Sequence, residues 1–373
     1  MSAAAGHRGT LAVDLLEQTV FRDRAFDVHA PSDLQEVLVR SQYRHHLERC
    51  APFSDFVLRR RPDVDAVLRG AGTLDDLPLL PVGAFKMADL CSLPPGARAL
   101  SHTSSGTSGT RSVVARDSET MMRLLGSVEA GLSLLGEWRE EDVSVLNLGL
   151  PHERAGDVWF AYVMSLVELL YASTSTMDVV EAATSLHHAL GHWETVFVVG
   201  PPFLVRDLCD HLCATGRTVA GDRVRVVTAG GWKTRHDHAL RRDDLLALLR
   251  RALGVAEDRY CDAFNQVELN SVLFECSAHQ KHVPPWVRAR ARHPRDLAVA
   301  PLGEEGLLSF MDASSTSYPA FFVGDDVGTV VGGTCGCGRT GERVHVSRRV
   351  STRVLKGCSA DLADVALAEA GRS

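Results

Sequence analysis

The chain has 373 residues, of which 45% are hydrophobic and 23% are charged. This balance is typical of a globular protein with one large domain or two ordinary ones, and it shows no compositional sign of disorder. A formal net charge of −7 argues against nonspecific binding of nucleic acid. No apolar run reaches the roughly 18 residues that a transmembrane helix needs.

The cysteine content and the N-terminus bear on the compartment of the protein. Nine cysteines, odd in number and irregularly spaced, do not form the pattern of a disulfide framework. The N-terminal residues lack the apolar stretch of a secretory signal. We therefore expect a cytoplasmic protein.

Residues 1–80 predict a helical N-terminal segment. Ser32 is placed to cap a helix, because a short hydroxyl side chain stands just before an amphipathic run. The stretch Leu77–Val82 is expected to be extended, since Pro78 and Pro81 disfavour the helical region for the residues before them.

From about Leu100 onward, short apolar runs alternate with longer amphipathic segments. The apolar runs predict strands at Val143–Leu148, Thr195–Val199, Arg223–Thr228 and Leu307–Met311. The amphipathic segments predict helices at Ser118–Leu135, Asp157–Tyr171, Val179–Leu190, Pro202–Ala214 and His238–Leu253. This alternation predicts an α/β architecture with partly parallel sheets, and the texture after Gly303 predicts an antiparallel end.

The most informative segment is the hydroxyl-rich loop Thr103–Ser112. Its serines and threonines alternate with Gly106 and Gly109, so backbone amides and hydroxyls could surround phosphate oxygens closely. The Gly-Lys-Ser/Thr ending of a Walker loop is missing. A solvent-exposed Ser/Gly linker is the alternative interpretation, although a linker separates domains and this loop leads into a helical pattern from Asp117.

Five motifs in a fixed order carry a resemblance to a known family. They are Leu80–Lys86, Thr103–Thr110, Ala229–Lys233, Phe264–Asn270, and Ser317–Phe321 with Asp326–Gly328. Each motif is weak alone, but in this order they make the chain resemble the LuxE-type acyl-protein synthetase branch of the adenylate-forming ligases, over roughly residues 78–359. The resemblance implies the large α/β N-terminal domain of that superfamily, with mixed sheets and a truncated C-terminal domain.

The same resemblance implies a domain division and an ATP site. We expect residues 1–80 to be the helical segment, 81–347 the adenylation core, and 348–373 a hinge with a vestigial tail. The implied ATP-binding residues are Thr103, Ser104, Ser105, Gly106, Thr107, Ser108, Gly109, Thr110, Gly230, Gly231, Asn265, Asp326 and Arg349. The site would be a cleft lined by the hydroxyl-rich loop, the Gly-Gly-Trp-Lys segment and the acidic motif.

Glu268 is the catalytic residue that the resemblance assigns to the acidic motif. It would hold Mg²⁺, a hard cation that prefers oxygen ligands. Asp326 would bind the ribose hydroxyls, and either Arg348 or Arg349 would be the hinge arginine near the ribose. The alternatives are an exposed helix carboxylate for Glu268 and plain turn chemistry for Asp326.

A second constellation has metal-ligand character. Cys276, His282, Cys335 and Cys337 supply three sulfurs and one imidazole, a set that suits tetrahedral Zn²⁺. A similar arrangement occurs in the LuxE-like and phenylacetate-CoA ligase-like branches, and it would be a structural site. His279 is a competing ligand, and unpaired buried cysteines are the alternative interpretation.

Cys358 is the candidate acyl acceptor. Relatives of the LuxE type carry an acylated cysteine near the C-terminus in a matching Gly-Cys context, and thiolate attack on an acyl-adenylate gives a thioester. The nearby Lys356, Arg353 and Arg349 could lower the pKa of the thiol. The alternative is an inert cysteine in a frayed tail.

The sequence as a whole predicts an ATP-dependent ligase that converts a carboxylic acid, by the resemblance a fatty acid, to acyl-AMP. The acyl group would pass to Cys358, a partner protein, coenzyme A or an amine. One alternative is a biosynthetic ligase that activates an aryl or amino acid. Another is a non-catalytic, zinc-stabilised adaptor. This alternative is favoured by Phe264–Asn265, which stand where the resembled family usually has Tyr-Gly. ATP, Mg²⁺ and structural Zn²⁺ are the expected cofactors.

Overall fold

The computed structural model describes residues 15–21, 25–26, 32–97, 100–104, 110–136, 140–231 and 239–350. The chain divides into two units. The first comprises Met1–Ala130, Gln266–Ser271 and His282–Ser373, and the second comprises Gly131–Asn265 and Val272–Lys281. The predicted boundaries after residues 80 and 347 stay predictions. Within the described ranges, no helix has both the length and the apolar character needed to cross a membrane.

A six-stranded sheet forms the centre of the second unit, in the order β5-β4-β6-β7-β8-β9. Its strands are β4 (Val143–Asn147), β5 (Ala172–Ser175), β6 (Thr195–Gly200), β7 (Val224–Ala229), β8 (Tyr260–Phe264) and β9 (Leu273–Phe274). All neighbours are parallel except β9, which runs antiparallel to β8. Strands β4 and β6 are buried along their whole length. Their predominantly apolar sequences reflect this burial, and the two predicted strands are confirmed.

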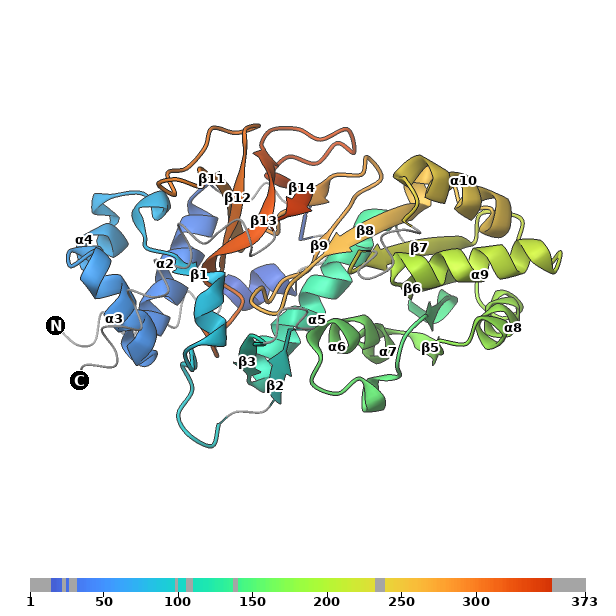
Figure 1. The fold of residues 1–373 in the computed structure, drawn as a ribbon, viewed down its shortest axis with the longest axis horizontal. Coiled ribbons are helices and arrows are strands. Elements are labelled where there is room, and N and C mark those ends of the chain that lie inside the picture. Colours follow the sequence, from blue (N-terminus) through green and yellow to red (C-terminus); the bar gives the residue numbers. More distant parts are fainter. Residues whose placement is uncertain are drawn as a thin grey trace. The chain divides into compact units, whose positions relative to one another are not determined.

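Three amphipathic helices pack against this sheet (Figure 1). They are α8 (Val179–Leu190), α9 (Pro202–Ala214) and α10 (Arg242–Leu253). Each buries an apolar stripe, and Leu186, Leu208 and Leu249 are fully buried in one cluster with the strands. Helix α8 begins where the Asp178 carboxylate accepts hydrogen bonds from the next two available backbone N–H groups, at 2.9 and 2.8 Å. The predicted helices over 179–190 and 202–214 are thus confirmed.

The predicted helix Asp157–Tyr171 differs from the structure. It is divided into α6 (Trp159–Ser165) and α7 (Val167–Leu170), and the chain then enters the exposed edge strand β5. The hydroxyl of Ser165 donates to the carbonyl of Tyr162 at 2.7 Å. Such a side-chain bond competes with the helical ladder and bends a helix, which explains the break. Strand β5 escaped prediction because its small, exposed residues form no apolar run.

A second six-stranded sheet belongs to the first unit. Its strands are β1 (Leu80–Pro81), β10 (Lys281–His282), β11 (Val287–Arg292), β12 (Glu305–Asp312), β13 (Phe321–Val331) and β14 (Arg343–Arg349). The order is β10-β14-β13-β12-β11, and β1 pairs with β13 in parallel. Pairing among β11 to β14 is antiparallel, as the texture after Gly303 predicts.

Aromatic side chains fix the N-terminal helices of the first unit to this sheet. The helices are α2 (Ser32–Arg49), α3 (Ala51–Arg60) and the short α4 (Val64–Ala66); α5 (Ser118–Leu132) follows later in the chain. The rings of Tyr43 on α2 and Phe53 on α3 both lie against Phe321 of β13, with centroid distances of 5.0 and 6.1 Å. All three side chains are fully buried. Such pairs add about 0.5–1.5 kcal/mol each beyond area burial.

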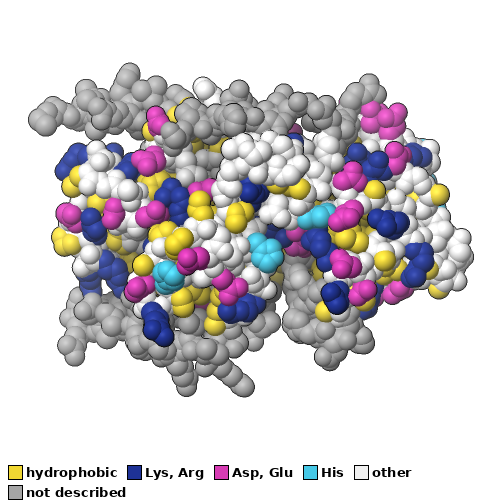
Figure 2. Space-filling model, turned by 90° about the horizontal axis from the view of Figure 1, so that it is seen from above, with side chains coloured by type: hydrophobic (Ala, Val, Ile, Leu, Met, Phe, Trp, Pro, Cys, Tyr) yellow, Lys and Arg dark blue, Asp and Glu magenta, His cyan; other side chains and the backbone are white. Residues whose placement is uncertain are grey.

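The surface of the described residues carries mixed charge. Figure 2 shows acidic and basic side chains interspersed on the visible face, without a broad area of one sign. Exposed charges among the described residues also form pairs, for example Arg348 with Glu305 at 3.1 Å. Exposed pairs contribute about 0–1 kcal/mol each, so stability depends mainly on the buried cores.

Two glycines that follow α9 and α10 provide a matched test of this packing. Gly216 and Gly254 both have φ +65°, but a Cβ at Gly254 would lie 2.7 Å from the carbonyl oxygen of Gly221, whereas a Cβ at Gly216 meets nothing within 4 Å. We expect Gly216→Ala to lower the free energy of unfolding by about 1–2 kcal/mol, the cost of a left-handed non-glycine residue. Gly254→Ala should cost about 1–3 kcal/mol more through the backbone clash. Equal urea midpoints for the two variants would contradict this account of the α10 terminus.

Candidate functional site

The hydroxyl-rich loop is carried by a β-hairpin. Strands β2 (Leu100–Thr103) and β3 (Val113–Arg116) pair antiparallel, with Thr103 opposite Val113. At the base of the loop, Ser104 donates its N–H to the carbonyl of Ser112 at 3.0 Å and accepts the Ser112 N–H on its hydroxyl at 3.1 Å. Thr103 and Ser104 are therefore placed by the hairpin, and Thr110 lies three residues before β3. Ser105, Gly106, Thr107, Ser108 and Gly109 lie outside the described residues.

Glu268 lies in the short loop 266–271, and its side chain is buried rather than exposed on a helix. Its carboxylate accepts a hydrogen bond from the hydroxyl of Ser112, at the base of the hairpin. Burial raises the pKa of Glu268, while the Ser112 hydroxyl and the positive charges of Arg349 and Lys86 act in the opposite direction. A buried carboxylate with these partners has the hard-oxygen chemistry that suits a divalent cation.

The loop that carries Glu268 is fixed by buried polar contacts. The Asn270 amide donates to the carbonyl of Thr120 at 3.0 Å, and the Ser271 N–H donates to the carboxylate of Asp312 at 2.8 Å. The indole N–H of Trp286 donates to the Ser271 hydroxyl at 2.8 Å. Since every one of these groups is buried, each bond would cost free energy to break, and the loop has one preferred conformation.

Asp326 and Arg349 face each other on neighbouring strands. They are register partners of β13 and β14, with 3.9 Å between Nε of Arg349 and Oδ1 of Asp326. Burial raises the pKa of Asp326, whereas Arg349 lowers it. Arg348, the other candidate for the hinge arginine, pairs with Glu305 instead. The strand register therefore favours Arg349 as the partner of the predicted ribose-binding carboxylate.

Gly230, Gly231 and Asn265 lie at the carboxyl ends of parallel strands. Gly230 and Gly231 follow β7 with φ of +82° and +62°, and Asn265 follows β8. Ligands of open α/β sheets bind at this edge. A Cβ at Gly230 would lie 2.4 Å from the ring of Phe160 on α6, so close packing itself requires glycine there. Trp232 and Lys233, the rest of this motif, lie outside the described residues.

Two contacts made by residues of the motifs were not predicted from the sequence. The indole N–H of Trp159 donates to the side-chain oxygen of Asn265, and the Ser112 hydroxyl donates to Glu268. The first contact joins residues 106 positions apart, and no local pattern predicts it. Ser112 belongs to the hydroxyl-rich segment, so the composition of that segment pointed to Ser112. Nothing in the sequence indicated that its partner is Glu268.

Four side chains form a group with metal-ligand character within the described part of the chain. The ligand atoms of Cys276, His282, Cys335 and Cys337 all lie within 4.8 Å of one another, and the sulfur of Cys337 is 3.4 Å from Nε2 of His282. Burial lowers the pKa of His282 to about 4, aided by nearby arginine charges, so its imidazole is neutral and able to bind a metal. The four predicted ligands are thus brought together.

The two cysteine-bearing hairpins have the same backbone pattern. In the first, the N–H of Cys276 donates to the carbonyl of Gln280, and the N–H of His279 donates to the carbonyl of Cys276. In the second, the N–H of Cys335 donates to the carbonyl of Arg339, and the N–H of Gly338 donates to the carbonyl of Cys335. His279 and Gly338 both have positive φ, 55° and 88°. Each is a tight turn that begins at a cysteine and is closed by backbone hydrogen bonds. Both hairpins therefore present their cysteine in the same manner.

His279, the competing ligand, is engaged elsewhere. Its Nδ1 is 2.7 Å from the guanidinium of Arg242, and its Nε2 is 3.2 Å from the carboxylate of Glu257. The same hairpin is anchored by Lys281, whose ammonium lies 2.9 Å from Glu275 and 3.0 Å from a carboxylate on β8. These contacts direct His279 away from the cysteine cluster and leave His282 as its imidazole.

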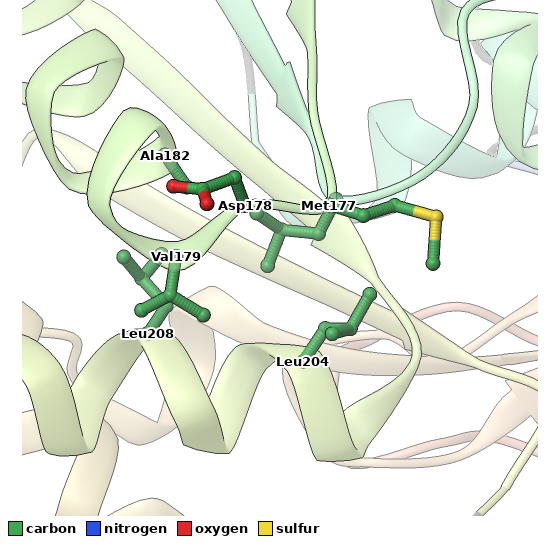
Figure 3. A pocket seen from close by; sticks show the side chains of 7 residues that line it. Met177, Asp178, Val179, Ala182, Leu204 and Leu208 are labelled. Atoms are coloured by element: carbon green, nitrogen blue, oxygen red, sulfur yellow. The ribbon is translucent and has the colours of Figure 1, made fainter.

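A small apolar pocket lies where α8 begins (Figure 3). Its lining residues are Leu148, Met177, Asp178, Val179, Ala182, Leu204 and Leu208. The one carboxylate among them, that of Asp178, caps α8 through the N–H groups of Val180 and Glu181. This pocket contains none of the predicted site residues, and its polar group is already used by the helix.

Comparisons with known proteins agree with the family resemblance that the motifs indicate. A family model described as acyl-protein synthetase, LuxE, matches residues 10–367. The long-chain-fatty-acid–luciferin-component ligase of Aliivibrio fischeri is 36% identical over 359 residues, covering 94% of this chain and 93% of that protein. The protein of the same name from Vibrio harveyi is 39% identical over 329 residues, covering 86% and 85%.

Solved structures show the same fold. A crystal structure of 2-hydroxyisobutyryl-CoA ligase in an open conformation, with 2-HIB-AMP and CoA, matches with a TM-score of 0.65 at 12% identity. The match covers 89% of this chain and 74% of that one. A long-chain-fatty-acid-CoA ligase from Archaeoglobus fulgidus matches with a TM-score of 0.51 at 14% identity, covering 70% and 53%. At these identities the likeness concerns the fold alone.

Proposed function

Since the chain belongs to the acyl-protein synthetase family LuxE, we propose that it activates a long-chain fatty acid with ATP and passes the acyl group to a thiol. The names of two relatives that cover most of the chain support the substrate class. The single observation that carries the chemistry is Glu268, a buried carboxylate held by the hydroxyl of Ser112 at the base of the hydroxyl-rich loop. The adaptor alternative needs no such carboxylate.

In the proposed first step, a carboxylate oxygen of the fatty acid attacks the α-phosphorus of ATP, and pyrophosphate leaves from the opposite side. The products are acyl-AMP and pyrophosphate. Little covalent chemistry falls to the protein, so its task is to orient the reactants and to balance negative charge. We assign the orientation of the phosphates to the hairpin loop and the binding of the ribose to Asp326.

Glu268 is the proposed Mg²⁺ ligand. Mg²⁺ binds through one or two carboxylates together with substrate phosphates, and a carboxylate beside a hydroxyl fits this preference. When bound, the ion supplies charge neutralisation at the phosphates. The chain contributes the fixed position of Glu268, because the Asn270 and Ser271 contacts prevent the loop from moving freely.

In the proposed second step, the sulfur of Cys358 attacks the carbonyl carbon of acyl-AMP, and AMP leaves with the bonding electrons. The thiol proton is lost to solvent, and the product is a thioester. Cys358 lies outside the described residues, so this role rests on the sequence alone. A partner protein or coenzyme A is the proposed final acceptor.

Pyrophosphate exchange is the direct test of the first step. With ATP, Mg²⁺ and a panel of fatty, aryl and amino acids, we expect exchange stimulated by long-chain fatty acids. Asp326→Asn should raise KM for ATP about tenfold or more, since a hydrogen bond to a charged group is worth about 1.5–3 kcal/mol. Asp325→Asn is the matched control, because successive strand residues point to opposite faces.

The panel also distinguishes the alternatives. Exchange with aryl or amino acids alone would replace the fatty-acid proposal by the biosynthetic one. No exchange with any acid, in folded protein, would support the adaptor. Equal KM for ATP in both aspartate variants would remove Asp326 from the site.

Covalent acylation tests the role of Cys358. With radiolabelled fatty acid and ATP, a thioester appears as label that survives denaturation but is released by hydroxylamine. Cys358→Ser should lose nearly all of this label, because the serine alcohol is a much weaker nucleophile than a thiolate. Its pyrophosphate exchange should stay within about twofold of wild type, because adenylation precedes the transfer. Cys213→Ser, on α9, is the control and should retain the label. Label retained by the Cys358 variant would exclude this residue as the acceptor.

Zinc is the proposed ion of the cysteine cluster. Two sulfurs bound to one tetrahedral Zn²⁺ lie roughly 3.8 Å apart, and the observed cluster is compact enough to close on such an ion. We expect about one zinc per chain by elemental analysis, loss of that zinc in Cys335→Ser, and a Tm lower by about 5 °C or more. The control variant Cys91→Ser should keep both the zinc content and the Tm of wild type. Wild-type protein expressed with zinc but free of it would contradict the assignment.

A further inference from the structure

Strand β3 ends in a fully buried arginine. The side chain of Arg116 is 0% exposed. Removing a guanidinium from water costs several kcal/mol unless its N–H groups find partners and its charge is balanced. Arg116 therefore has to be explained by what it binds, and its position on the hairpin that carries the hydroxyl-rich loop makes those partners informative.

The partners of Arg116 belong to the loop that carries Glu268. Nη2 donates to the carbonyl of Val267 at 2.6 Å, and Nε donates to the side-chain oxygen of Asn270 at 3.2 Å. Nη2 also donates to the hydroxyl of Tyr318 at 2.9 Å. One guanidinium thus bonds the loop on both sides of Glu268.

The bond to Val267 has a direct geometric consequence. The carbonyl of Val267 and the N–H of Glu268 belong to the same planar peptide unit, which rotates only as a whole. Fixing that carbonyl therefore holds the Cα of Glu268 in place, and the bond to Asn270 restrains the loop on the other side of the same residue. A lysine would carry the same positive charge as Arg116, but its compact ammonium cannot reproduce the flat, divergent donors of a guanidinium.

The same hairpin also contacts Glu268 at its carboxylate. Ser112 and Arg116 stand four residues apart, at positions that share one face of an extended strand, and both side chains are buried. Ser112 bonds the Glu268 carboxylate, and Arg116 bonds the peptide before it. The hairpin that bears the hydroxyl-rich loop therefore holds Glu268 at two points.

We propose that Arg116 is a positioning residue for adenylation, one that fixes the Glu268 carboxylate relative to the base of the hydroxyl-rich loop, at Ser104 and Ser112 of the same hairpin. This inference rests on the proposed function. Metal–ATP binding requires the carboxylate and the phosphate-binding groups at a set separation, and a displacement of about 1 Å can cost about 100-fold in rate. Arg116 sets that separation by joining the two segments within one rigid contact.

The test compares Arg116→Lys with a matched variant. Arg292 on β11 is also a buried arginine, but its side chain donates to Ser309 at 3.0 Å and to the carbonyl of Leu297 at 2.9 Å. Arg292→Lys therefore carries a similar structural penalty without touching the Glu268 loop. The measurements on full-length protein are Mn²⁺ binding in the presence of ATP, followed by the electron paramagnetic resonance signal of free Mn²⁺, and pyrophosphate exchange with varied Mg²⁺.

We expect Arg116→Lys to weaken Mn²⁺ binding in the presence of ATP by about tenfold and to slow exchange by about 10–100-fold, as loss of a group that orients a metal ligand typically does. Arg292→Lys should change neither by more than about twofold, even if both variants lose stability. Tyr318→Phe removes one acceptor of Arg116 and should give a smaller loss, about threefold, which keeps the test decisive if Arg116→Lys does not fold.

Wild-type Mn²⁺ binding by Arg116→Lys, or equal losses in the Arg116 and Arg292 variants, would overturn the inference. If wild type itself shows no exchange with any acid, the proposed function fails. The metal-binding comparison still decides the role of Arg116 in that case, because Mn²⁺ and ATP binding is measured without turnover.

Discussion

The buried carboxylate of Glu268 is the constraint on which the candidate site depends. A carboxylate removed from water is unstable unless hydrogen bonds and opposite charges compensate it. The Ser112 hydroxyl and the charges of Arg349 and Lys86 supply that compensation. Because those groups come from the hairpin, from β14 and from the segment after β1, the elements of the first unit must keep a fixed arrangement around a single side chain.

Much of the fold follows from local sequence pattern. Strands β4, β6 and β7 are rich in valine and largely buried because helices cover a parallel sheet, and this apolar bias allowed their prediction from sequence. Strand β5 is exposed at the edge and has no such pattern, and the Ser165 hydroxyl that interrupts the helix before it acts through a bond that composition does not reveal. Burial is visible in a sequence, whereas the choice of a hydrogen-bond partner is not.

The candidate site shows the same division. The order of the motifs identified the family, and cysteine spacing identified the metal-ligand group, but spacing could not choose between His279 and His282. The choice depends on Arg242 and Glu257, which bind His279 from distant parts of the chain. Likewise, only the register of β13 and β14 separates Arg349 from Arg348, since a shift of one residue reverses the face of a strand.

The paired cysteine hairpins bear on the timing of synthesis. One pair of ligands ends at His282 and the other begins at Cys335, so more than fifty residues of new chain separate them. A ribosome adding about 5–20 residues per second leaves the first hairpin incomplete for several seconds, with its cysteine accessible to oxidants. An ion that requires all four side chains cannot be bound until Cys337 has been made. Loading of the proposed zinc would therefore be a late event, restricted to chains in which β11, β12 and β13 have already been translated.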